Sequence, residues 1–391
     1  MSVAPTGPHL AAMQGGQVLD LDVFTRVSAS PPIPPGVSWR PWIIRLAPHE
    51  FRQFDLLCRE RGITVIDMLD RQLMDLAAVR LPWTALAADR RRFIDAAVEA
   101  QGGWASYGNW VYLPWEAKIA HLLDRDAYFE VITNRNADKI TAEEQQLLRT
   151  KRIGVIGLSV GGEAAVTLAQ EHLCGEIVLA DFDQLDLSNL NRLNAGFDEL
   201  GIKKATIVAR RIAKINPYLG VTVFDAGVTA ENLGAFVDGL DLLIEECDSL
   251  PIKCEVRLLA KARGLNIVYA ADERGFLSVE PYALWPDLRP FHGLIEQPQA
   301  PRAAFPTTLA FMKALTEWMG GWNNISERSR RSLERVGDTL CGYPQLASEA
   351  RYAAGQIGYV ARRLLLGEAL VPFVGNLDPA EFLPATPRPG G

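Results

Sequence analysis

The sequence predicts an α/β protein: a Rossmann-like, doubly wound, mostly parallel sheet with a helical N-terminal domain and a helical C-terminal extension. Six short, largely apolar runs predict the strands, at 152–157, 176–183, 220–228, 241–247, 266–272 and 276–282. Segments with helical spacing of apolar residues separate them, and strand–helix alternation with near-continuous apolar strands is typical of a parallel sheet. Similar helical spacing before and after this stretch predicts the two helical flanks.

These patterns divide the chain into four parts. Residues 1–37 end in the Pro/Gly/Ser-rich run "SASPPIPPG" and are predicted to be a disordered leader. Residues 38–128 are predicted to form a mainly helical domain, since apolar residues recur at helical spacing over 48–100. Residues 129–285 contain the strand–helix alternation of the nucleotide-binding domain. Residues 286–391 are predicted to be a helical extension with a flexible Pro/Gly tail.

Composition narrows the functional class. The net charge of −7 argues against a dedicated nucleic-acid binder, which usually has a basic face. The five cysteines are scattered and form no CxxC pair, which predicts a reducing, cytoplasmic location without a paired-thiolate zinc site. The sequence has neither a signal peptide nor a membrane-spanning run, so we expect no membrane association. Six of the nine tryptophans lie between Trp39 and Trp115, and we expect an aromatic core there rather than a partner-binding surface.

The segment "RIGVIGLSVGGEA" (152–164) has two incompatible interpretations. It contains "GLSVG", which matches the nucleophile turn of α/β-hydrolases, and Asp248 and His292 follow Ser159 in the order of a catalytic triad. The same residues also predict a strand, a glycine-rich turn and a helix start, which together cradle a phosphate. We favour the phosphate site, because Asp181 follows at about the separation of a ribose-binding carboxylate in dinucleotide-type folds.

Polar residues gather at the ends of two predicted strands and at the start of one helix. They lie in "ADFDQLDLSNLNR" (180–192), "GIKK" (201–204) and "EECDS" (245–249). The carboxyl ends of parallel strands meet in one crevice, so these residues should surround the glycine-rich turn. Cations neutralise phosphate charge, and a carboxylate can hold magnesium. Such a set suits a triphosphate whose bond is broken better than a dinucleotide, and it predicts ATP and Mg²⁺ as ligands.

These motifs resemble the ThiF/MoeB-type adenylyltransferase family, which is related to the ubiquitin-activating enzymes. The resemblance covers about residues 130–282, and it rests on "NRNADKITAEEQQLL", "VIGLSVGG", "ADFDQLDLSNLNR", "GIKKA", "KINP" and "EECDS". The later segments "FHGLIE" and "GYPQLASE" are similar to a subgroup in which this module is fused to a nitroreductase domain. The resemblance implies that a carboxylate attacks the α-phosphorus of Mg·ATP, giving an acyl-adenylate and pyrophosphate.

The resemblance also implies roles for the matching positions. Nucleotide-binding positions are Gly157, Ser159, Gly162, Asp181, Asp183, Asn189, Arg192 and Lys204, with Asp181 at the ribose. Catalytic positions are Arg192, Lys204, Asp248 and Arg135, of which Asp248 organises the magnesium and Arg135 reaches the phosphates from the partner subunit of a homodimer. The implied substrate is a carboxylate on a small ubiquitin-like protein, a peptide or a metabolite.

Each of these signals has a simpler interpretation. Arg192 and Lys204 could be solvated surface charges, and Asp248 could cap a helix beginning near Pro251. Arg135 could pair with a neighbouring glutamate on the surface. The terminal "PRPGG" ends in the Gly-Gly of ubiquitin-like substrates, although a flexible tail is the simpler interpretation.

The sequence departs from the family pattern in three places. Ser159 and Val160 replace the middle pair of the usual glycine-rich turn, and Leu193 stands where a glutamine is common. These changes leave open a catalytically inactive nucleotide-binding scaffold that binds a partner. The similarity to nitroreductase-fused members leaves open a further alternative, an NAD- or flavin-linked redox partner. In addition, no cysteine lies between Cys254 and Cys341, which predicts activation without a covalent enzyme intermediate.

Overall fold

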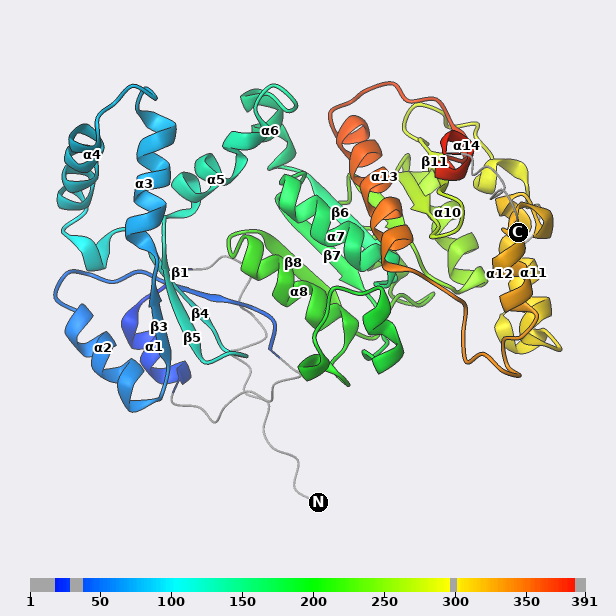
Figure 1. Cartoon of the computed structure of the whole chain (residues 1–391), viewed down its shortest axis with the longest axis horizontal. Helices are drawn as coiled ribbons and strands as arrows, with labels where there is room; N and C mark the ends of the chain where they lie inside the picture. The colour runs from blue at the N-terminus through cyan, green and yellow to red at the C-terminus, as the bar shows by residue number, and fades with distance from the viewer. Residues whose placement is uncertain (1–17, 29–37, 296–300, 384–391) are drawn as a thin grey trace, which may run out of the picture. The chain divides into compact units, whose positions relative to one another are not determined.

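The computed structural model describes residues 18–28, 38–295 and 301–383, and the chain divides into two compact units. Unit 1 comprises residues 1–142 and 212–221, and unit 2 comprises residues 143–211 and 222–391. Figure 1 labels their helices and strands. The predicted leader is wrong for the stretch 18–28, which forms β1 (Val18–Leu19) and α1 (Leu21–Ser28) and buries Leu21 and Phe24 in the core. The predicted tail lies almost wholly outside the described residues, as does the terminal Gly-Gly.

Unit 1 combines helices with a sheet that the sequence did not predict. The helices are α2 (Phe51–Glu60), α3 (Leu69–Arg80), α4 (Ala87–Ala100) and α5 (Arg125–Thr133). The further strands are β2 (Trp42–Ile44), β3 (Thr64–Asp67), β4 (Asn109–Leu113) and β5 (Lys118–Leu122). They form one sheet in the order β1-β2-β4-β5-β3. The prediction of a mainly helical domain therefore missed a five-stranded sheet.

Three of the missed strands, β2, β3 and β4, lie within the tryptophan-rich stretch 39–115. The first three residues of β4 are all buried, so the strand lacks the alternation of apolar and polar residues by which a half-buried strand is recognised. Trp110 and Trp42 are buried with Phe54 in one hydrophobic cluster, as an aromatic core requires. Trp83, in contrast, is 88% exposed. The prediction of an aromatic core therefore holds for part of the tryptophan set.

Unit 2 contains the predicted doubly wound sheet. Its strands are β6 (Arg152–Ile156), β7 (Glu176–Ala180), β8 (Gly220–Phe224), β9 (Leu242–Glu245), β10 (Asn266–Ala270), β11 (Phe276–Glu280) and β12 (Phe373–Asn376). Their order is β12-β11-β10-β9-β6-β7-β8. β6 is parallel to β7 and β9, and β10 is parallel to β9, whereas β11 and β12 are antiparallel additions. All six predicted strands are present, and the fold class is confirmed.

Helices cover both faces of this sheet. They include α7 (Val160–Glu171), α8 (Lys204–Ile215), α9 (Leu233–Phe236), α10 (Leu250–Arg263) and α13 (Ala347–Leu365), with α11 (Thr308–Thr316) and α12 (Glu327–Leu333) further along the chain. The Cα of Gly154 faces Phe236 of α9, and its neighbour Val155 contacts Gly161 of α7. Because consecutive residues of a strand face opposite sides, α7 and α9 lie on opposite faces.

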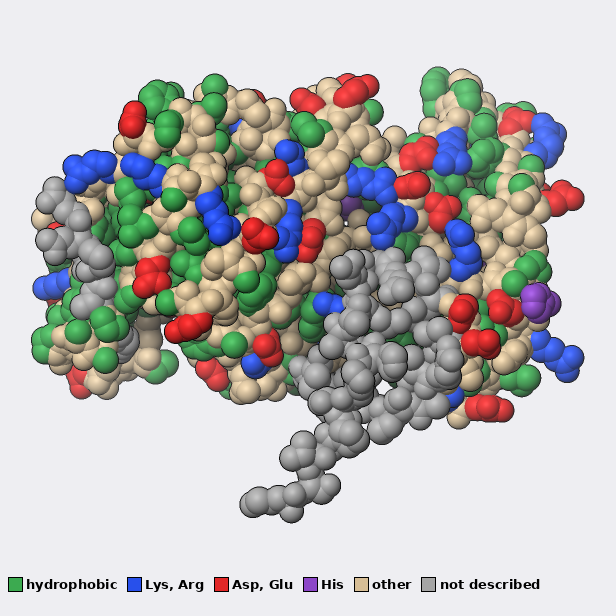
Figure 2. Space-filling view, turned by 180° about the vertical axis from the view of Figure 1, so that it is seen from behind, with side chains coloured by type: hydrophobic (Ala, Val, Ile, Leu, Met, Phe, Trp, Pro, Cys, Tyr) green, Lys and Arg blue, Asp and Glu red, His purple; other side chains and the backbone are tan. Residues whose placement is uncertain are grey.

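The predicted C-terminal extension belongs to the same compact unit as the sheet. Its helix α13 packs against α7, β9, β10 and β11, and β12 pairs with β11. Over the face of the molecule shown in Figure 2, basic and acidic side chains are interspersed. No helix within the described ranges is long and apolar enough to cross a membrane.

Candidate nucleotide site

The turn between β6 and α7 is built around one glycine. Gly157 has a φ of +80°, and a Cβ at this position would lie 2.5 Å from the backbone oxygen of Glu246. Only glycine fits such a position without strain. The helix α7 begins at Val160, directly after Ser159, so its free backbone N–H groups and the positive end of its dipole face the end of the sheet. The turn is therefore suited to an anionic ligand.

Asp181, which follows β7, holds this turn in place. Its Oδ2 accepts a hydrogen bond from the backbone N–H of Leu158 at 2.6 Å, and its Oδ1 accepts one from Asp183 at 2.7 Å. The side chain is buried, and burial raises its pKa although these two hydrogen bonds oppose the shift. Asp181 thus has a structural task at this turn, and its contact with a ribose stays a prediction.

A cavity of about 390 Å³ lies beyond the turn, at the carboxyl ends of β6, β7, β9 and β10. Its lining includes the predicted residues Ser159, Asp183, Asn189, Arg192, Lys204 and Asp248. It also includes Val160, Gln184, Asp186, Glu246, Cys247, Lys253, Tyr269, Ala271, Asp272, Leu315 and Gln345. Gly157, Gly162 and Asp181 are not part of this lining, and the Cα of Gly162 faces Val208 of α8. Gly162 therefore serves helix packing in this structure.

Two cations, Lys204 and Arg192, line the cavity. Lys204 is the first residue of α8, and its Nζ donates to Oδ2 of Asp183 at 2.8 Å. Arg192 donates from Nε to Oγ of Ser159 at 3.3 Å and from Nη1 to the backbone oxygen of Ser188 at 3.2 Å. Burial lowers the pKa of Arg192, and nearby carboxylates oppose this shift. Arg192 is thus held against the glycine turn, and Lys204 is held by Asp183 in the same lining.

Asp248 faces these cations from the end of β9. The N-cap of α10 is Ser249, whose Oγ accepts from the backbone N–H of Ile252 at 3.4 Å, so Asp248 is not the helix cap. Burial among the cavity walls raises the pKa of Asp248, and Lys253 and Lys204 oppose that shift. Its side chain is nevertheless open to the cavity.

This donor set fits a metal ion that arrives with a nucleotide. In the described part of the chain, no group of three or more His, Cys, Asp or Glu side chains is placed to hold a metal. Mg²⁺ is commonly bound by one or two carboxylates together with substrate phosphates. Asp248, open to the cavity beside two cations, matches that pattern rather than an all-protein metal site.

Gln345 and Asp272, two cavity residues that the sequence did not single out as site residues, are hydrogen-bonded to one another. Nε2 of Gln345 donates to Oδ2 of Asp272 at 2.6 Å, and the backbone oxygen of Gln345 accepts from Nδ2 of Asn191 at 2.7 Å. Asp272 is the second residue after β10, so the reasoning that selected Asp248 beyond a strand end could also have selected it. Gln345 lies in the segment "GYPQLASE" (342–349), which resembles a subgroup of the family, but nothing in the sequence indicated that this segment, which runs into α13, reaches the cavity.

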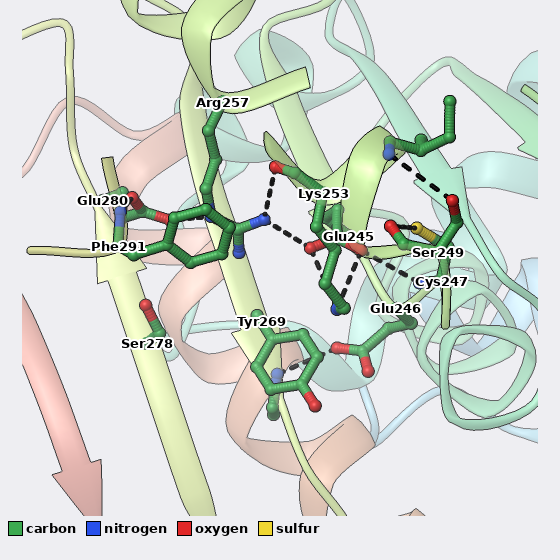
Figure 3. Close-up of polar contacts among 12 residues, drawn as sticks. Glu245, Glu246, Cys247, Ser249, Lys253, Arg257, Tyr269, Ser278, Glu280 and Phe291 are labelled. Atoms are coloured by element: carbon green, nitrogen blue, oxygen red, sulfur yellow. Dashed lines mark hydrogen bonds and ion pairs between the residues drawn. The ribbon is translucent and has the colours of Figure 1, made fainter. Parts of the chain in front are cut away.

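A buried ionic network supports the cavity from the side of α10 (Figure 3). Glu245, the last residue of β9, accepts from Nζ of Lys253 at 3.0 and 3.1 Å and from Nη1 of Arg257 at 2.5 Å. Nε of Arg257 donates to Glu280 at 2.7 Å. Burial alone would raise the pKa of Glu245, but the two cations outweigh it and hold the value at about 2. Lys253 also lines the cavity, so the network fixes one wall of the site.

The hydrolase alternative is wrong. Ser159 accepts a hydrogen bond from Arg192, whereas His292 lies outside the cavity lining with its Nε2 3.1 Å from Oγ of Ser278. The triad that the chain order allowed is therefore not assembled. Cys247 does line the cavity, but burial raises the pKa of its thiol well above the usual value, which keeps it protonated.

Arg135 belongs to the other unit. It is exposed within a short 3-10 helix (Asn134–Asn136) of unit 1. Its predicted contact with the nucleotide of a partner subunit stays a prediction.

Residues 133–278 match the model of the ThiF family. The uncharacterized protein MT1398 of Mycobacterium tuberculosis (strain CDC 1551 / Oshkosh) is 41% identical over 261 residues, which cover 67% of this chain and 36% of that protein. Ubiquitin-like modifier-activating enzyme 5 of Drosophila melanogaster is 24% identical, over 46% of this chain and 48% of the enzyme.

The tRNA threonylcarbamoyladenosine dehydratase of Escherichia coli (strain K12) is 36% identical over 30% of this chain and 44% of the enzyme. A crystal structure of the E. coli enzyme in complex with AMP gives a TM-score of 0.43 at 22% identity, covering 60% of this chain and 93% of that one. The chain spans between about a third and a half of the length of these three curated relatives. The predicted relation to nitroreductase-fused members is not shown by them and stays a prediction. The segment that matches the ThiF family model carries the glycine turn, Arg192, Lys204 and Asp248.

Proposed function

We propose that this protein is an adenylyltransferase that binds Mg·ATP and activates a carboxylate as an acyl-adenylate. The observation that carries the proposal is the convergence of Arg192, Lys204 and Asp248, from three separate segments, on one cavity beside the turn at Gly157. Two cations next to a helix N-terminus suit a polyphosphate, and an open carboxylate suits its magnesium. The match of residues 133–278 to the ThiF family model supports the same chemistry.

The residues divide the reaction between them. Lys204 and Arg192 neutralise the phosphate oxygens, on which charge develops as the bond to pyrophosphate breaks. Asp183, which lines the cavity beside Lys204, is better placed than Asp181 to meet the ribose hydroxyls. Asp248 is the residue that would hold Mg²⁺, which supplies positive charge to the triphosphate when bound. The substrate carboxylate then attacks the α-phosphorus, and pyrophosphate leaves.

The substrate class is part of the proposal. One relative is named for activating a ubiquitin-like modifier and another for dehydrating a modified adenosine of tRNA, so these names support no single substrate. We propose a carboxylate on a small protein, a peptide or a metabolite. Isotope exchange between pyrophosphate and ATP, screened over such carboxylates, tests this directly. Carboxylate-dependent exchange that is lost in Lys204→Met is expected. Tight ATP binding without exchange or pyrophosphate release over the whole panel would favour the inactive scaffold instead.

We also propose that Arg135 acts across a homodimer. If it reaches the partner subunit's nucleotide, a mixture of Arg135→Ala and Asp248→Asn proteins contains heterodimers with one complete site. Re-mixing the two inactive variants should then restore up to about a quarter of the wild-type exchange rate. A mixture as inactive as its components, with subunit exchange verified by mass spectrometry, would contradict the trans role.

A further inference from the structure

The strand order divides the cavity into two ends. The strands β7, β6, β9 and β10 are consecutive neighbours, and they carry Asp183, Ser159, Asp248 and Asp272 at or just beyond their carboxyl ends. Neighbouring strands lie about 4.8 Å apart, so β10 is roughly 10 Å from the strand that leads into the glycine turn. If the nucleotide occupies the β7 and β6 end, the end at β10 is left for the group that reacts with it.

Asp272 at this end is buried, and Arg192 attracts its carboxylate electrostatically from beyond ion-pair distance. It is only 8% exposed, it lines the cavity, and its hydrogen-bond donor is the neutral amide of Gln345. In the described part of the chain, no Lys, Arg or His lies within ion-pair distance of its carboxylate. The charged and titratable groups around it include Arg192, Glu246, Asp248, Tyr269, Tyr343 and Glu349, and Glu273 is its neighbour in the chain.

An unpaired buried carboxylate is costly to keep. Burial raises the pKa of Asp272 to about 6, so the group is still ionised at neutral pH and the fold bears the cost of that charge. A perturbed, unpaired acid that faces a cavity is characteristic of a ligand site. The chemistry that would compensate it is a cation that enters with a ligand.

The acceptor of the acyl group must also come from outside the chain. Cys247 is the cysteine that lines the cavity within the described residues, and its raised pKa keeps it a neutral thiol. The amine of Lys253 is bonded to Glu245 and is 1% exposed. Neither residue is therefore available as a nucleophile.

We propose that Asp272 binds the ammonium group of the acyl acceptor, and that this acceptor is a primary amine, so that the product is an amide. The inference rests on the proposed adenylation at the other end of the cavity. Asp272 takes one proton from the ammonium, and the freed lone pair forms a C–N bond to the carbonyl carbon of the acyl-adenylate. The C–O bond to AMP breaks, AMP leaves as a phosphate monoester, and the second proton passes to solvent. The ring of Tyr269 and the side chain of Leu315 provide an apolar wall for the rest of the amine.

The test uses n-butylammonium as the probe and 1-butanol as its neutral counterpart, measured by saturation-transfer NMR on the full chain saturated with AMP and Mg²⁺. Wild type should bind the ammonium at least tenfold more tightly than the alcohol, since a charged hydrogen bond is lost with the alcohol. Asp272→Asn should abolish this preference while binding AMP within about twofold of wild type. The variant retains an oxygen for Gln345, so it should fold normally.

Glu273→Gln is the matched control, because Glu273 is the adjacent buried carboxylate but does not line the cavity. It should keep the preference for the ammonium. Equal ammonium binding by wild type and Asp272→Asn, or no preference in wild type, would overturn the proposal. Loss of Mg²⁺ or AMP binding in Asp272→Asn would also overturn it, because Asp272 would then belong to the nucleotide end. If wild type does not bind AMP at all, the proposed adenylation fails, and the same titration without nucleotide still decides the role of Asp272.

Discussion

Two adjacent glutamates at the end of β9 have pKa values shifted in opposite directions (Figure 3). Glu245 is fully buried among Lys253 and Arg257 of α10, which hold its pKa at about 2. Glu246 accepts a hydrogen bond from the backbone N–H of Ala270 at 2.8 Å, and burial raises its pKa well above the usual value. The two side chains leave the strand end on opposite sides, one toward α10 and the other into the cavity.

The comparison separates structural charges from functional ones. The network of Glu245 is neutral overall and fully buried, and it fixes the position of α10. Glu246, Asp248 and Asp272 all line the cavity, and burial raises the pKa of each. Folds usually pair the charges that they bury, and the exceptions gather at sites that bind ligands.

Among the structural charges, the largest loss of stability is expected from a substitution of Arg257. Arg257→Leu leaves the carboxylates of Glu245 and Glu280 without a shared cation in the interior, and we expect a loss of about 3–5 kcal/mol in the free energy of unfolding. Denaturant titration measures it. Arg263→Leu, on the same helix but 3.8 Å from the exposed Asp238, should cost less than about 1 kcal/mol. Similar losses in both variants would refute a structural role for the network.

Among the functional charges, the largest loss of activity is expected from a substitution of Lys204. Lys204→Met should lower carboxylate-dependent pyrophosphate exchange by about 10²–10³-fold, as the loss of one charge-stabilising donor does, with little change in unfolding free energy. The preceding Lys203 pairs with Asp225 outside the cavity lining and is the matched control. Lys203→Met should stay within about threefold of wild type. Equal losses of exchange activity in the two variants would show that Lys204 does not contact the phosphates.

Two glycines, Gly157 in the turn between β6 and α7 and Gly162 in α7, test whether the turn itself requires glycine. Gly157→Ala requires a positive φ and places a Cβ against the backbone of Glu246, so we expect about 3 kcal/mol of destabilisation. Gly162→Ala meets the tip of Val208 at 3.1 Å within a helix that favours alanine, and it should change stability by less than about 1 kcal/mol. Thermal and chemical unfolding of both variants compare the two effects. A larger loss at Gly162 would contradict the observed turn.

Asp272→Asn should stabilise the protein. The folded-state pKa of about 6 lies above the usual 3.8, so the ionised side chain lowers stability as the pH rises from about 4 to 6 and continues to do so at higher pH. Asparagine removes that charge and retains the bond from Gln345, and we expect a gain of about 1–3 kcal/mol at pH 8 that vanishes below pH 4. Unfolding measured across this pH range checks the sign. A variant less stable than wild type at pH 8 would mean that the charge is compensated.

The smallest effect is expected from the cysteines. Replacement of Cys58, Cys174, Cys247, Cys254 and Cys341 together should leave adenylation within about threefold of wild type, because the cavity thiol is protonated. Circular dichroism verifies folding and pyrophosphate exchange measures activity. A loss of a hundredfold in a folded variant would show a covalent step.

The sequence was most informative where strands are buried on both faces. Runs such as "DLLIEEC" gave the strands of unit 2 and led to Asp248, because a short apolar run that ends in acids indicates a strand end at a site. The strand β4 (Asn109–Leu113) was missed because it opens with a polar asparagine and its first three residues are all buried. It therefore shows neither a fully apolar run nor a clear alternation of apolar and polar residues. The sequence assigned the ribose to Asp181, because it could not show that this carboxylate is bonded to the backbone of Leu158. Gln345 required the tertiary structure itself.

The most direct test of the central claim is calorimetric titration of Mg·ATP, and separately of NADH, into wild type, Arg192→Ala and Asp248→Ala. We predict micromolar affinity of wild type for Mg·ATP, at least tenfold weaker binding in both variants, and no comparable binding of NADH. Absence of Mg·ATP binding, or tighter NADH binding that both substitutions leave unchanged, would contradict a nucleotide triphosphate site in this cavity.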